Sequence, residues 1–144
     1  MKKLIIGALF TLAFTGNANA HLTPDEQAAK SRGILLFNQY KNAQLELRIA
    51  AEAGDAEAQF YLAERLRKEK RFMTVEAQKW YEKSANQSNV YAMIQLGRSD
   101  DNLCVNMGNC PASTKTPAQW LKHALDLTKP VAESGDPRSD VLNV

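Results

Sequence analysis

The sequence predicts an all-α fold, a short α-solenoid in which antiparallel helix pairs pack side by side. The main observation is a repeat: residues 51–62 recur as residues 85–96 with an offset of 34, which aligns Ala58 with Ala92. A cut-off third copy begins at Ala132. A fixed period of this length marks helix pairs that each need a neighbour to bury their apolar face. Recurrent helix-start signals, and the lack of a convincing strand pattern after the first 20 residues, agree with this fold.

Residues 1–20 have the pattern of a secretory signal peptide that is cut after Ala20. A positive start, Lys2-Lys3, precedes an apolar run over residues 4–14 and an Ala-x-Ala cleavage pattern that ends at Ala20. The run is too short for a permanent membrane-spanning helix. An uncleaved N-terminal anchor is the weaker alternative. We therefore expect a periplasmic or secreted protein with no stable membrane insertion.

The charge of the processed chain is balanced. Loss of Lys2 and Lys3 leaves 16 basic and 16 acidic residues out of the 18 and 16 of the whole sequence. A balanced chain has no electrostatic footprint for nucleic acid or for an anionic membrane, so we expect neither as a partner.

The first predicted helix caps the array and belongs to an N-terminal segment, residues 21–42. Thr23 is its expected N-cap, Pro24 suits the first helical position, and Glu26 completes a capping box. A second helix is predicted over residues 43–53, with an apolar side supplied by Leu45, Leu47, Ile49 and Ala50.

Gly54 and Asp55 form a stop-and-start signal between helices. Gly54 can adopt the left-handed backbone that ends a helix, and Asp55 can cap the next helix, predicted over residues 56–68. Ser88-Asn89 repeats this signal imperfectly, because serine lacks the freedom of glycine at positive φ.

Two further helices are predicted over residues 75–86, capped by Thr74, and over residues 90–98. Trp80 and Tyr81 lie on the packing stripe of the first of these. We interpret both as core residues rather than as a ligand site.

Residues 99–116 are predicted to form an inserted loop that holds both cysteines, Cys104 and Cys110. Export would place them in an oxidising compartment, so a disulfide is expected, and it would hold the loop in place for partner specificity or simply stabilise it. A metal site is the weaker alternative, because no further Cys or His lies nearby in the sequence.

A helix is predicted to begin after the loop, at Thr116-Pro117, where Gln119 completes a second capping box. Trp120 takes the place of Trp80 in this copy. Pro130 is expected to end or kink the helix, and a last helical piece is predicted over residues 137–143.

These motifs resemble the Sel-one-like repeat family, which is related to the tetratricopeptide repeats. Residues 56–63 (AEAQFYLA) resemble the first helix of that repeat, residues 76–85 (EAQKWYEKSA) the second, and residues 90–97 the start of the next. The resemblance implies a repeat array over residues 43–144, interrupted by the inserted loop. The family's glycine-containing loop before the second helix is missing here, and its regular cysteine spacing does not carry over.

No catalytic site is predicted. The sequence has no nucleophile-elbow, metalloprotease, phosphate-loop or dinucleotide-binding motif. A copper site is a remote alternative: cleavage would make His21 the N-terminal residue, and only His123 could provide a second imidazole. No other metal or cofactor is expected.

A protein-binding module is the preferred hypothesis. In the family, the first helix of each repeat lines the concave side of the array, which suits extended contact with another protein. The resemblance therefore makes five residues candidates for partner contact, although each could equally be ordinary surface or packing: Gln59, Tyr61, Arg65, Gln95 and Arg98.

Small exported proteins with this repeat resemble periplasmic immunity proteins that neutralise antibacterial effectors, notably phospholipase-like effectors of the type VI secretion system. The resemblance implies this role by analogy of fold. The alternative is a periplasmic adaptor or scaffold in envelope signalling, followed by a protein that binds host proteins.

Overall fold

The computed structural model describes residues 21–98 and 103–133, and every regular element in these ranges is a helix. The helices are α1 (Pro24–Asn38), α2 (Gln44–Glu52), α3 (Ala56–Lys70), α4 (Val75–Asn86), α5 (Val90–Gly97), α6 (Leu103–Met107) and α7 (Pro117–Glu133). The all-α prediction is therefore confirmed. The predicted signal peptide and the predicted helical piece over residues 137–143 lie outside the described residues.

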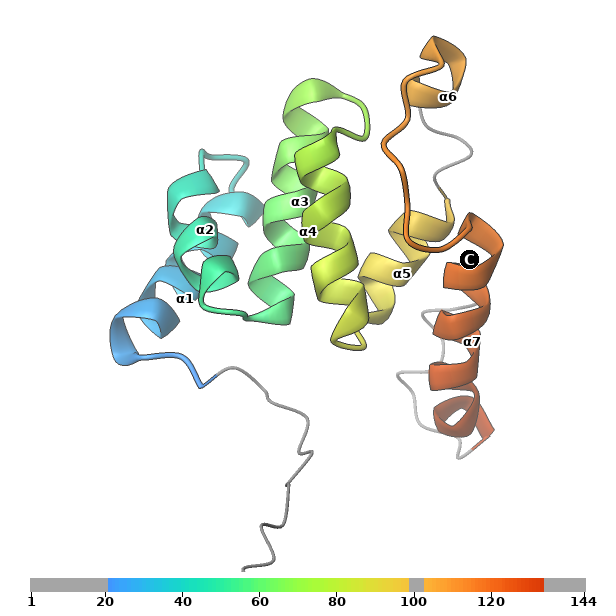
Figure 1. The fold of residues 1–144 in the computed structure, drawn as a ribbon. Helices are drawn as coiled ribbons and strands as arrows, with labels where there is room; N and C mark the ends of the chain where they lie inside the picture. Colours follow the sequence, from blue (N-terminus) through green and yellow to red (C-terminus); the bar gives the residue numbers. More distant parts are fainter. Residues whose placement is uncertain (1–20, 99–102, 134–144) are drawn as a thin grey trace, which may run out of the picture.

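The helices form a row of packed neighbours (Figure 1). Each of α1 to α4 packs against the next helix in the chain, α1 also touches α3, and α5 packs against α7. The short helix α6 stands beside the row rather than within it. Helix pairs that pack in sequence order are the arrangement that the repeat predicts.

Three threonines begin helices as predicted. The Thr23 side chain accepts a hydrogen bond from the Glu26 amide, and the Glu26 carboxylate accepts one from the Thr23 amide. Thr116 and Gln119 form the same reciprocal pair at the start of α7. Thr74 accepts from the amide three residues later at the start of α4. Each cap satisfies helix-end donors that otherwise lack a partner.

The two repeat turns have the same backbone shape. Gly54 has φ 98° and Ser88 has φ 68°, so both residues are left-handed. Ser88 therefore takes the conformation of glycine although its Cβ makes that conformation unfavourable. The imperfect match in the sequence is thus a substitution within one turn type.

Backbone hydrogen bonds repeat with the same offset. The Asp55 amide donates to the Ala50 carbonyl at 3.1 Å, and the Asn89 amide donates to the Ser84 carbonyl at 3.2 Å. The side chains of Asp55 and Asn89 then each accept from the amide three residues later, at the starts of α3 and α5. The 34-residue period is therefore a period of hydrogen bonds as well as of sequence.

One core runs through the row of helices. Trp120 and Tyr81 are its largest fully buried side chains, and Trp80 is also buried. Small residues fill the spaces between the helices: Ala43, Ala50, Ala51, Ala58, Ala63, Ala77, Ala85, Ala92 and Ala124. The interpretation of Trp80 and Tyr81 as core residues is confirmed.

Two glycines allow close helix approach. A Cβ on Gly33 of α1 would lie 2.9 Å from the Leu47 side chain and 3.0 Å from the Leu47 backbone nitrogen in α2. A Cβ on Gly97 of α5 would lie 2.3 Å from Leu121 Cγ in α7. Glycine therefore lets α1 meet α2, and α5 meet α7, closer than a larger residue would.

Three details differ from the sequence-based expectations. The inserted segment was expected to be a loop, but it contains α6, Leu103–Met107. Helix α3 runs to Lys70, two residues past the predicted end, and stops where Arg71 turns left-handed with φ 65°. At Pro130, where an end or a kink is expected, α7 does not end but continues to Glu133. Proline removes one donor and crowds the preceding turn, but the helix continues past it.

Candidate partner-binding surface

Four of the five residues predicted to contact a partner lie on two helical stripes. On α3, Tyr61 and Arg65 are four residues apart and half-buried. Gln95 of α5 is half-buried, and Arg98, the C-cap residue of this helix, is exposed. Residues three or four apart lie on one face of a helix. The structure therefore places each pair on one side of its own helix.

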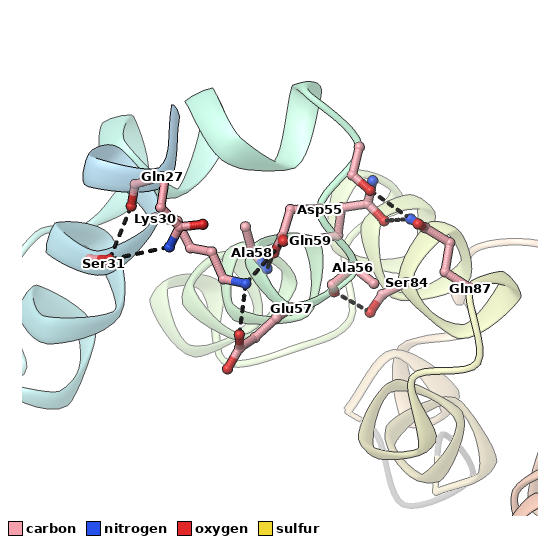
Figure 2. A network of polar contacts seen from close by, with 11 residues as sticks. Gln27, Lys30, Ser31, Asp55, Ala56, Glu57, Ala58, Gln59, Ser84 and Gln87 are labelled. Atoms are coloured by element: carbon pink, nitrogen blue, oxygen red, sulfur yellow. Dashed lines mark hydrogen bonds and ion pairs between the residues drawn. The ribbon is translucent and has the colours of Figure 1, made fainter. Parts of the chain in front are cut away.

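Gln59, the fifth predicted contact residue, is only 4 % exposed. Its amide nitrogen donates to the Ala51 carbonyl at 3.1 Å. Its amide oxygen accepts from Gln87 Nε2 at 2.9 Å (Figure 2). Gln87 Nε2 also donates to the Gly54 carbonyl. The Gln59 amide therefore joins α2, α3 and α4, and little of it faces a partner.

A neighbouring set of ion pairs joins α1 to the N-terminal end of α3. Lys30 Nζ on α1 lies 2.9 Å from both Asp55 Oδ2 and Glu57 Oε2, and Figure 2 shows this lysine reaching across to α3. Burial is the largest single influence on the pKa of Lys30 and lowers it. The hydrogen bonds to the two carboxylates and their charges together outweigh burial, so the pKa is raised. The Glu57 carboxylate thus has a cationic partner within the protein.

Sequence reasoning missed a row of aromatic rings that links three helices. Phe37 of α1 lies 5.1 Å from Tyr61 of α3, measured between ring centroids, and Phe60 lies 5.4 Å from Tyr61. Phe60 in turn lies 6.1 Å from Tyr91 of α5. Tyr91 is 53 % exposed, and the other three rings are half-buried. Contacts at these separations are typical of interacting aromatic pairs.

We call this region the α1–α3–α5 surface. It comprises Phe37, Phe60, Tyr61, Arg65, Tyr91, Gln95 and Arg98. The only hint of Tyr91 in the sequence is the 34-residue period, which aligns Tyr91 of α5 with Glu57 of α3. Contact between rings on different helices could not be read from the sequence.

The hydroxyl of Tyr61 stays neutral. Burial, followed by the charge of Glu57 and the proximity of Tyr91, raises the pKa of Tyr61 above its ordinary value of 10.0. Tyr61 therefore offers a hydroxyl and a ring to a partner at any physiological pH.

A buried polar group beneath the surface fixes α3 against α4. The Tyr81 hydroxyl donates to Glu64 Oε1 at 2.6 Å, and Arg67 donates to both the Tyr81 oxygen (3.0 Å) and Glu64 Oε2 (3.1 Å). Burial, and then the charge of Glu64, raises the pKa of Tyr81. The carboxylate of buried Glu64 is thus hydrogen-bonded, as a buried charge requires.

The inserted segment is held by side chains. Cys104 and Cys110 are joined by a disulfide with Sγ atoms 2.01 Å apart, as predicted, and Cys104 is buried in the core. Glu82 Oε1 of α4 accepts hydrogen bonds from Ser113 Oγ and from the Thr114 amide, both at 2.9 Å. Trp120 Nε1 donates to Ser113 Oγ at 3.3 Å.

A pocket of about 440 Å³ lies between part of this segment and the region around the start of α4. It is bordered by Met73 and Gln78 on one side and by Val105, Cys110 and Pro111 on the other. The predicted role of the insertion in partner specificity stays a prediction.

Within the part of the chain that the structure describes, no three His, Cys, Asp or Glu side chains come together to hold a metal ion. His21 precedes α1 and His123 lies in α7, and these two helices are at opposite ends of the row (Figure 1). The copper hypothesis therefore gains no second histidine near His21. In the same residues, no helix has the length and apolar character needed to cross a membrane.

Comparisons with protein-family models, with curated proteins and with solved structures find no significant match to this chain. The functional interpretation therefore depends on the geometry of the residues themselves.

Proposed function

We propose that this protein is an exported, non-enzymatic binding module of the Sel-one-like type that engages another protein through the α1–α3–α5 surface. The aromatic row from Phe37 to Tyr91 is the observation that carries the proposal. Tyrosine and arginine are enriched among the residues that dominate binding energy at protein interfaces. On this surface, Tyr61 and Tyr91 lie on the same helix faces as Arg65 and Arg98.

The rigid support beneath the surface favours binding over chemistry. Buried hydrogen bonds tie α3 to α2 through Gln59 and to α4 through Glu64. Side chains held on packed helices lose less freedom when a partner binds, which improves affinity. No nucleophile with an adjacent base is found among the described residues of this surface.

The specific role that we propose is that of an immunity protein, which covers an antibacterial effector of the phospholipase-like, type VI-delivered class in the periplasm. Support comes from the predicted signal peptide, the disulfide Cys104–Cys110, the balanced charge and the repeat resemblance. A compact helical array with an extended contact surface suits a neutralising complex.

The test is a protection experiment. Candidate effectors encoded beside this gene are directed to the periplasm, and survival is measured with and without this protein. The proposal predicts rescue from one of them, loss of rescue in Tyr91→Ala, and full rescue in Val75→Ala. Val75 is a matched exposed apolar residue on α4, 75 % exposed and outside the surface. If the protein rescues cells from none of the candidates, the immunity role is contradicted. Equal rescue by both variants would contradict the assignment of the α1–α3–α5 surface as the binding surface.

A further inference from the structure

The α1–α3–α5 surface has two chemically different halves. Towards the N-terminal ends of α3 and α5 it is aromatic, with Phe60, Tyr61 and Tyr91. One turn further along each helix it is cationic or polar, with Arg65 on α3 and Gln95 on α5, and Arg98 follows at the C-cap of α5. A ligand that lies along these helices therefore meets rings first and guanidinium groups next.

The carboxylates near this surface already have cationic partners. Glu57 pairs with Lys30 at 2.9 Å. Glu64 is buried and bonded to Tyr81 and Arg67. These carboxylates therefore contribute little uncompensated negative charge to the surface.

The two arginines are less well paired: Arg65 has one long ion pair, with Glu69, and Arg98 has none among the described residues. Arg65 Nε is buried and has no hydrogen-bond partner among the described residues. The nearest carboxylate oxygen paired with Arg65 is Glu69 Oε2, which is 4.0 Å from Nη2. Arg98 is exposed and makes no ion pair with any residue that the structure describes. Among the described residues, the charge that this surface leaves weakly paired is therefore positive.

A carboxylate is the group that fits this arrangement best. Guanidinium binds carboxylate through two parallel N–H donors, and the Nε–Nη edge is one such donor pair. A buried donor without an acceptor is unfavourable, so an incoming acceptor gains by satisfying it. The Arg65 side chain is 27 % exposed, so part of it is within reach of a partner.

We propose that the α1–α3–α5 surface binds a segment of another protein that carries an aspartate or glutamate next to an aromatic or aliphatic side chain. The carboxylate pairs with Arg65 and Arg98, and the apolar side chain packs on Tyr61 and Tyr91. This inference rests on the proposed protein-binding function and specifies the chemistry of its partner. A polyanion such as nucleic acid or an anionic membrane fits less well, because the processed chain has equal numbers of acidic and basic residues.

The experiment is selection from a random phage-displayed peptide library on the purified, processed chain. Bound sequences are compared with those bound by Arg65→Gln, Arg98→Gln, Arg65→Lys and Tyr91→Ala. Arg32→Gln is the matched control, because Arg32 is exposed on α1 in a groove that it shares with Leu45 and Ile49. Thermal unfolding of each variant verifies folding.

The expected result is enrichment of peptides with an acidic residue beside an apolar one. Their affinity should fall about tenfold or more in Arg65→Gln, as is usual when one partner of a charged hydrogen bond is removed. Arg65→Lys should also lose affinity, because lysine keeps the charge but not the Nε–Nη donor pair. Arg32→Gln should bind as the parent chain does.

Three outcomes would overturn the inference. The enriched peptides could lack acidic residues and could bind the arginine variants but not Tyr91→Ala. This result would agree with the binding function but contradict an acidic partner. No enrichment, or binding that no variant of the surface alters, would contradict both. Arginine-dependent binding to phosphatidylglycerol vesicles or to an oligonucleotide in place of peptides would show that the surface recognises phosphate instead.

Discussion

The repeat region from α2 to α5 and the inserted segment between α5 and α7 are held together in different ways. In the repeat region, short turns are fixed by backbone hydrogen bonds that recur with the period, as at Asp55 and Asn89. In the inserted segment, the chain is fixed by side chains, the Cys104–Cys110 disulfide and the bonds to Glu82. Periodic packing therefore specifies the first region, whereas a few covalent and polar contacts specify the second.

The largest expected effect is at Trp120, where the two regions meet. This side chain is fully buried in the core and donates to Ser113 of the insertion. Trp120→Ala should lower the free energy of unfolding by about 3–5 kcal/mol, because a large cavity would remain. Urea unfolding measures this loss. Trp80→Ala, which empties the corresponding place in the repeat region, is the comparison, and a loss near zero at Trp120 would contradict the placement of α7 in the row.

Removal of the disulfide should have the next largest effect, and a local one. Replacing both Cys104 and Cys110 with serine should cost about 2 kcal/mol in the insertion, the value for a short closed loop. Hydrogen exchange should then accelerate over residues 103–116 and remain slow in α3 and α4. Acceleration throughout the chain would show that the insertion supports the whole array.

The repeat turns should respond oppositely to exchange of their left-handed residues. Ser88→Gly should stabilise the protein by up to about 1 kcal/mol, because glycine reaches φ 68° without a Cβ clash. Gly54→Ser should destabilise it by a similar amount, since φ is 98° there. Thermal unfolding of the two variants, and of the double exchange, provides the test. Equal signs for both changes would mean that the turns are not equivalent.

The smallest expected effect is a pH dependence in the repeat region. A hydrogen bond from Arg48, 2.6 Å away, is the main reason that the pKa of Glu76 lies below its ordinary value of 4.5. A lowered pKa means that the pair stabilises the folded state above that value and that this contribution is lost as the pH falls through the folded pKa. Both side chains are partly exposed, so we expect only a few tenths of a kcal/mol. Acid unfolding of Glu76→Gln should lack this component, and an unchanged profile would contradict it.

The sequence predicted the repeat region well because its signals are local. Thr74 and Asp55 each cap a helix through bonds that span three residues, and such bonds are visible as spacings in the sequence. Helix α6 was missed, because five residues are too few for a hydrophobic period to appear. At Pro130 the sequence predicted an end or a kink, because proline is a helix breaker, and the structure rules out the end, since α7 continues to Glu133.

The candidate surface was predicted only in part. Tyr61, Arg65, Gln95 and Arg98 came from the family resemblance, whereas the structure shows that the Gln59 amide is buried and bonded. The aromatic row was not predicted, because Phe37, Phe60 and Tyr91 come together only when three helices are packed. Contacts of this kind depend on tertiary distances, which spacing along one helix does not provide.

Site-specific photo-crosslinking tests the central claim most directly. A photoreactive amino acid at position 91 or at position 75 would report which surface another protein touches. The experiment uses cells that produce the protein from its full-length gene together with an effector that the protection experiment identifies. We predict a crosslink to that effector from position 91 on α5 and none from position 75, although the side chain of Val75 is more exposed than that of Tyr91. Crosslinks of equal strength from both positions, or from position 75 alone, would contradict the assignment of the α1–α3–α5 surface as the binding surface.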